Sequence, residues 1–168
     1  VQGDMAPSRD PGFAAGHFIV QDESESLVVE LLAPQPGEFV VDLCAAPGGK
    51  TTHIAEKVGP QGHVLAVEAQ MGRVARLEEN IARMGFDNVE IRCEDGLSLK
   101  LERPADRVLV DAPCSGLGVL AKRADARWRK TEASIRQVTS LQEMLIEAGG
   151  NMVRPGGTLV YSVCSFEP

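Results

Sequence analysis

The feature that most constrains the fold is a regular alternation, from residue 39 onward, of short β-branched runs with segments of helical periodicity. Five runs are expected to form strands: 39–44, 63–68, 88–93, 107–112 and 157–164. Four segments are expected to form helices: 24–32, 50–57, 71–84 and 131–153. Such alternation predicts an α/β fold with a mostly parallel sheet and helices on both of its faces.

Local signals predict where the helices begin and end. Asp22 or Ser24 is expected to cap the first helix, because both side chains can accept a hydrogen bond from a free backbone N–H. Gly59, Gly85 and Gly156 are expected to end the three later helices.

The carboxyl ends of the expected strands carry the candidate functional residues. In open parallel sheets, ligands bind beyond these ends. An acid or a thiol stands at or just past each of them: Asp42, Glu68, Asp95, Asp111 and Cys164. A single strand-end aspartate often only caps a helix, but five such residues together indicate a site.

Composition excludes several classes of protein. The chain has 168 residues, which is about one domain, and it contains no apolar run long enough to cross a membrane. Residues 1–18 lack the basic flank and apolar core of a signal peptide. The four cysteines form no CxxC pair and the three histidines do not complete a zinc site, so no metal is expected. Unpaired thiols without a signal peptide predict a cytoplasmic location.

The turn "CAAPGGKT" (44–51) has a spelling close to that of a phosphate-binding P-loop, and "VLVD" (108–111) could supply the acidic strand that holds magnesium in such proteins. However, Cys44 stands where the P-loop needs its first glycine, and Pro47 removes a backbone N–H that would bind phosphate. The dinucleotide signature GxGxxG is absent as well. The turn therefore argues against a nucleoside triphosphate or dinucleotide ligand.

The same turn suits an adenosine ligand that carries no phosphate. Its small residues, Ala45–Gly49, let a ligand approach the backbone closely. Glu68 is placed to accept hydrogen bonds from both hydroxyls of a ribose, and Asp95 to hold an adenine amino group. S-adenosylmethionine is the common ligand of this kind.

Two thiols are expected at the same rim if the fourth and fifth strands are neighbours. Cys114 lies in the irregular stretch "DAPCSG", where reactive residues tend to occur, and Cys164 ends the last strand. Cys44 and Cys93 are expected to be inert packing residues. Thiols, a carboxylate and a methyl donor suit methylation at C5 of a pyrimidine, because a thiolate that adds to C6 makes C5 nucleophilic. From the residues alone, either thiol could attack while the other assists the later elimination.

With these motifs assembled, the chain resembles the Sun/Nop-type RNA (cytosine-5) methyltransferases, and among them the bacterial 16S ribosomal RNA enzymes. The resemblance rests on "FIVQDESESLVVELLAPQPGE", "DLCAAPGGKTTHIAE", "EDG", "VDAPCSGLGVL", "RW", "LQ" and "VRPGGTLVYSVCS", and it covers about nine-tenths of the chain. It implies a Rossmann-like methyltransferase fold with S-adenosylmethionine as cofactor. The cofactor-binding residues that it implies are Cys44, Ala45, Ala46, Pro47, Gly48, Gly49, Lys50, Glu68, Asp95 and Asp111.

The resemblance also assigns catalytic roles. It makes Cys164 the nucleophile, Cys114 the residue that promotes product release, and Asp111 the acid at N3 of cytosine. Val163 departs from the family, which usually has threonine there, and family members continue past residue 168. The expected organisation is therefore a lead-in segment (1–22) and a catalytic core (23–168) that lacks its C-terminal strands.

The implied partner is RNA, chiefly ribosomal RNA, and the protein is expected to be a monomer that does not bind membranes. A net charge of −7 is unusual for a general nucleic-acid binder, but residues 122–136 hold six basic and two acidic residues around Trp128. That stretch is the candidate RNA contact; a plain solvated face is the alternative. Two alternative functions stay open: a fragment that binds S-adenosylmethionine or RNA without turnover, and a transfer RNA cytosine-5 methyltransferase.

Overall fold

The computed structural model describes residues 6–116 and 131–165. Its helices are a 3₁₀ turn η1 (Pro7–Arg9), then α1 (Pro11–Ala14), α2 (Glu23–Leu32), α3 (Gly49–Val58), α4 (Met71–Met84) and α5 (Glu132–Met152). Its strands are β1 (Phe39–Asp42), β2 (His63–Val67), β3 (Val89–Arg92), β4 (Ala105–Asp111) and β5 (Val153–Ser162). Within these ranges, no helix has both the length and the apolar character needed to cross a membrane.

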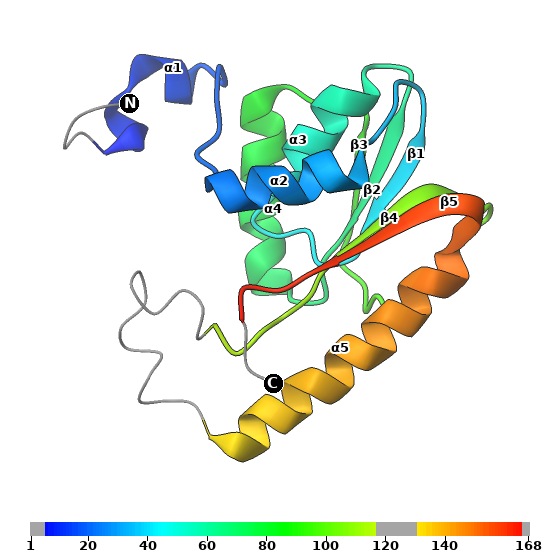
Figure 1. Cartoon of the computed structure of the whole chain (residues 1–168). Helices are drawn as coiled ribbons and strands as arrows, with labels where there is room; N and C mark the ends of the chain where they lie inside the picture. The colour runs from blue at the N-terminus through cyan, green and yellow to red at the C-terminus, as the bar shows by residue number, and fades with distance from the viewer. Residues whose placement is uncertain (1–5, 117–130, 166–168) are drawn as a thin grey trace.

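The five strands form one parallel sheet in the order β3-β2-β1-β4-β5 (Figure 1). The sheet confirms the predicted α/β class, and β4 and β5 are neighbours as the thiol hypothesis requires. The register places Asp42 beside Leu109 and Asp111 beside Ser162. The functional ends of β1, β4 and β5 therefore lie next to one another at one edge of the sheet.

Helices cover both faces of the sheet, with α2, α3 and α4 on one face and α5 on the other (Figure 1). Successive strand residues point to opposite faces, so Val40 joins the core under α2 and α3, whereas Val41 joins the core under α5. Strands buried on both faces need continuous apolar runs, which is why "FVV" and "VLV" occur at their centres. This double layer holds the strand ends in a fixed arrangement.

All four predicted helices match within one residue at each end, but the glycine expected to end the last one does not do so. Gly59 and Gly85 are C-caps with positive φ, as expected, whereas α5 ends at Met152 and Gly156 lies inside β5. The reason is a register shift, in which Ala105 pairs with Val153 but Arg107 already pairs with Thr158. The extra residues of β5 bulge out of the ladder, and the positive φ of Gly156, 76°, serves that bulge instead of a helix end.

The lead-in segment contains two short helical turns that the sequence pattern did not predict, η1 and α1. It docks on the end of α4 through Arg83, whose guanidinium donates to the carbonyls of Phe13 and Phe18 and lies 3.8 Å from the centre of the Phe13 ring. Asp22 is the N-cap residue of α2, although its side chain makes no capping hydrogen bond.

Candidate active site

The β1–α3 turn, Leu43–Gly48, forms the first wall of the site, and side chains of α4 fix its shape. Arg73 donates to the carbonyl of Ala46 at 2.5 Å, and Asn80 donates to the carbonyl of Pro47 at 2.8 Å. Gly48 has a φ of 105°, and a Cβ there would come within 2.9 Å of Leu77. Glycine is favoured at this position because the positive φ would strain a residue with a side chain, and Leu77 would have to shift to make room for a Cβ.

Glu68, just past the end of β2, has the environment expected of a ribose acceptor. Its side chain is only 4% exposed; one oxygen accepts from the N–H of Gln70 at 2.9 Å, and the other lies 3.1 Å from the Arg73 guanidinium. That second oxygen has no hydrogen-bonded partner within the described residues. A buried carboxylate oxygen without a donor fits a ligand hydroxyl, so these residues fit an adenosine cofactor.

Asp42 is the most deeply buried acid at this edge; the strand-end pattern included it among the candidates, but no binding or catalytic role was predicted for it. Its carboxylate is 1% exposed and accepts one hydrogen bond from Thr51 Oγ1 at 2.8 Å, while its other oxygen has no partner in the described structure. Burial raises the pKa of Asp42 from 3.8 to about 6, and the nearby charge of Asp111 adds to this increase.

Replacing Asp42 with asparagine should make the protein more stable at neutral pH. The pKa of Asp42 is higher in the folded than in the unfolded chain, so the folded state stays protonated up to a higher pH. The free energy of unfolding therefore falls as pH rises from about 4 to 6. Asp42→Asn removes this loss, so the gain should reach roughly 1–3 kcal/mol at pH 7.5 and nearly vanish at pH 4. Urea unfolding of parent and variant at both values measures it.

The exposed Asp87 supplies the matched control, because Asp87→Asn changes a charge that folding does not bury. A stability difference between Asp42→Asn and the parent that is the same at both pH values would contradict the proposed titration.

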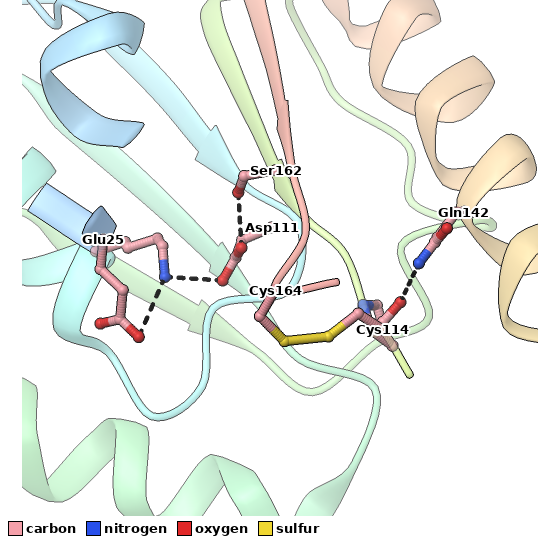
Figure 2. Close-up of a disulfide and its surroundings, with 8 residues drawn as sticks. Glu25, Asp111, Cys114, Gln142, Ser162 and Cys164 are labelled. Atoms are coloured by element: carbon pink, nitrogen blue, oxygen red, sulfur yellow. Dashed lines mark hydrogen bonds and ion pairs between the residues drawn. A yellow bond between two sulfur atoms is a disulfide. The ribbon is translucent and has the colours of Figure 1, made fainter. Parts of the chain in front are cut away.

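Asp111, at the end of β4, is held on both of its oxygens (Figure 2). Lys50 Nζ lies 2.9 Å from Oδ2, and Ser162 Oγ donates to Oδ1 at 2.6 Å. Lys50 is only 11% exposed and also lies 3.8 Å from Glu25 on α2. Lys50 of α3 therefore links the turn that is predicted to bind the cofactor to Asp111, the acid predicted to contact the cytosine base.

The two candidate catalytic thiols are in direct contact. Cys114 and Cys164 form a disulfide, with their Cα atoms 6.1 Å apart, beside Asp111 (Figure 2). This corrects the expectation that all four thiols are unpaired, since parallel pairing of β4 and β5 brings together two cysteines 50 residues apart. Gln142 of α5 donates to the carbonyl of Pro113, next to Cys114, at 2.7 Å.

The two remaining cysteines differ from each other. Cys44 packs against the core, and burial raises the pKa of its thiol to about 12, so the predicted inert role is supported. Cys93 is exposed, so the prediction that it is a packing residue is wrong; β3 ends one residue earlier, at Arg92. Asp95 is also exposed, and one oxygen of its side chain accepts from the N–H of Leu97 at 3.0 Å.

The structure thus assembles most of the predicted site residues on one edge: the turn, Glu68, Lys50, Asp111 and the two thiols. Side chains that contact this set and to which the sequence pattern assigned no role are Glu25, Arg73 and Ser162; Gln142 contacts Pro113, the residue before Cys114. No cluster of three potential metal ligands occurs among the described residues. Most of the basic stretch 122–136, including Trp128, lies outside them.

Comparison with known proteins identifies the family. The model of the 16S rRNA methyltransferase RsmB/F family matches residues 29–168. The chain belongs to this family. The family and its structural neighbours are S-adenosylmethionine-dependent methyltransferases, which confirms the resemblance, the predicted Rossmann-like fold and the predicted cofactor.

Two curated relatives illustrate the RsmB/F match. The probable ribosomal RNA small subunit methyltransferase B of Synechocystis sp. is 45% identical over 161 residues, covering 94% of this chain and 36% of the relative. Ribosomal RNA small subunit methyltransferase B of Cronobacter sakazakii is 43% identical, covering 94% of this chain and 37% of the relative. The chain thus spans little more than a third of these relatives' length.

Two solved structures from Pyrococcus horikoshii are also similar to this chain. NSun6 from Pyrococcus horikoshii, crystallised with SFG, has a TM-score of 0.87 and 35% identity, covering 95% of this chain and 41% of that protein. A methyltransferase homolog protein from the same organism has a TM-score of 0.86 and 34% identity, covering 99% of this chain and 52% of that protein.

Proposed function

We propose that this chain is the catalytic core of an enzyme that transfers a methyl group from S-adenosylmethionine to C5 of cytosine in ribosomal RNA. The observation that carries the proposal is the meeting of Cys114 and Cys164 with the Lys50–Asp111 pair, next to the cofactor turn. RsmB/F membership and the names of the curated relatives support ribosomal RNA as the substrate. Such a substrate also favours a cytoplasmic enzyme.

Cofactor binding is assigned to the β1–α3 turn and the two strand ends that follow it. The small residues Ala45–Gly49 let the ligand lie against the backbone, Glu68 accepts the ribose hydroxyls, and Asp95 lies on the adenine side. S-adenosylmethionine supplies a methyl group made electrophilic by its sulfonium. Asp111 borders both the cofactor and the base.

In the first chemical step, the Cys164 thiolate adds to C6 of the cytosine. The C5–C6 electron pair moves onto C5, and the negative charge extends toward N3, to which Asp111 in its protonated form is proposed to donate a hydrogen bond. Lys50, whose Nζ lies 2.9 Å from Asp111 Oδ2, adds a positive charge that stabilises the adduct further. C5 then takes the methyl group, and both thiols must be reduced for the reaction to start.

In the second step, the adduct collapses to product. The proton on C5 passes to the Cys114 thiolate, the C5–H electrons re-form the C5–C6 double bond, and the S–C6 electrons return to Cys164. The cysteines thus divide attack and release between them. Their contact in the structure supports this division, because both sulfurs must reach the same base.

Methyl transfer to RNA tests the function directly. The chain, and a longer polypeptide that contains it, are incubated with S-adenosylmethionine, a reducing agent and either ribosomal or transfer RNA, and the nucleosides are then analysed by mass spectrometry. 5-Methylcytidine formed in ribosomal RNA supports the proposal. Methyl groups on another atom, or only in transfer RNA, contradict it. Cofactor binding without methylation by either polypeptide would favour the alternative of a binding fragment.

Replacing Glu68 with alanine should weaken cofactor binding. The variant loses a buried acceptor for the ribose hydroxyls, so affinity for S-adenosylmethionine should fall by roughly 1–3 kcal/mol in calorimetry. Glu79→Ala, which removes an exposed carboxylate from α4, is the matched control and should bind like the parent. Unchanged affinity in Glu68→Ala would remove this residue from the site, and tight binding of ATP with magnesium would favour the P-loop alternative.

A further inference from the structure

We propose that Gln142 is a positioning residue for Cys114, and that it governs product release; this inference rests on the proposed function. The Gln142 side chain reaches from α5 to the Pro113 carbonyl, 2.7 Å away, in the residue directly before Cys114 (Figure 2). No role for Gln142 follows from the cofactor turn or from the attack of Cys164. Its contact is with the segment that carries the releasing thiol.

The backbone explains why this segment needs an external support. The β4–β5 ladder continues through the N–H of Ala112, which donates to the carbonyl of Ser162 at 3.0 Å. Pro113 has no N–H to continue it, so the ladder of backbone hydrogen bonds cannot extend through this residue toward Cys114. When the thiols are reduced, the disulfide no longer holds Cys114, and the hydrogen bond from Gln142 remains.

Gln142 can be replaced without loss of the helix that carries it. The buried residues of α5 are Leu145, Gly149 and Met152, all in its C-terminal half. Gly149 lies so close to β4 and β5 that a Cβ there would come within 2.9 Å of Leu159 and 3.0 Å of Val110. This packing fixes the helix on the sheet, so the side chain of Gln142 affects the Pro113 carbonyl more than the fold.

The predicted defect is confined to the second chemical step. If Cys114 is displaced, Cys164 still adds to C6 and methyl transfer still occurs, but the C5 proton leaves slowly and the S–C6 bond persists. Gln142→Met, of similar length and unable to donate, should keep single-turnover methyl transfer within about twofold of the parent. Its steady-state turnover should fall roughly tenfold, with more protein covalently bound to RNA on a denaturing gel.

Gln137→Met provides the matched control, because Gln137 is an exposed glutamine on the same helix and should leave both rates unchanged. Gln142→Glu gives a second readout. Its carboxylate stays ionised between about pH 8 and 5.5 and cannot donate to the Pro113 carbonyl, so Gln142→Glu should show the same slow release as Gln142→Met across this range.

Three outcomes overturn the inference: Gln142→Met behaving like Gln137→Met, an equal loss in single-turnover and steady-state rates together with a lower melting temperature, or Gln142→Glu releasing product as fast as the parent. A parent protein that transfers no methyl group at all overturns the proposed function first, so the two failures can be told apart.

Discussion

Cys164→Ser should abolish methyl transfer to RNA, with the rate falling on the order of 10³-fold or more. A serine hydroxyl is not ionised near neutral pH, whereas a thiol is partly ionised and far more nucleophilic, so no bond to C6 can form. Cofactor binding should persist, because the turn and Glu68 are untouched. Tritiated methyl transfer and a denaturing gel for the protein–RNA adduct measure the two effects in the presence of a reducing agent.

Cys93→Ser is the matched control, since Cys93 is an exposed free thiol away from the Cys114–Cys164 pair. It should transfer methyl groups like the parent. A trapped adduct in Cys164→Ser would mean that Cys114 attacks and that the two roles are exchanged. Undiminished methylation in Cys164→Ser would rule out this thiol as the nucleophile.

The strands and the helices α2 to α5 were predictable because each of them has a local signal. Strands buried on both faces require continuous β-branched runs, and the C-caps of α3 and α4 require glycines in the left-handed region, so both can be recognised within a few residues of sequence. The prediction that Gly156 ends a helix was wrong because this local signal is ambiguous. A glycine with positive φ serves a bulge as well as a helix end, and only the register between β4 and β5 distinguishes them.

The site was predictable where its residues follow strands, and not where they come from distant helices. The strand-end rule selected Glu68, Asp111 and Cys164 as candidates, and the structure places them at the same edge because parallel strands bring their carboxyl ends together. The hydrogen bond of Gln142 to Pro113 joins residues 29 positions apart, and that of Ser162 to Asp111 joins residues 51 positions apart. Neither contact has a local signal, because each depends on how α5 and β5 pack against β4.

Cys114→Ala should have the opposite effect to Cys164→Ser on the covalent adduct. Cys164 still adds to C6 and C5 still receives the methyl group, but without the second thiol the C5 proton is not removed efficiently and the S–C6 bond persists. Protein cross-linked to RNA should therefore accumulate on a denaturing gel, while steady-state turnover falls on the order of 100-fold or more.

The Cys114→Ala variant also tests whether the reducing agent is needed only to open the disulfide, because without Cys114 the disulfide to Cys164 cannot form. Adduct formation by Cys114→Ala should then be the same with and without a reducing agent, whereas the parent should require one. The double variant Cys114→Ala/Cys164→Ser is the decisive comparison, since it should form no adduct if Cys164 is the attacking sulfur. An adduct that survives in the double variant would come from another nucleophile, and the division of attack and release between these two cysteines would be wrong.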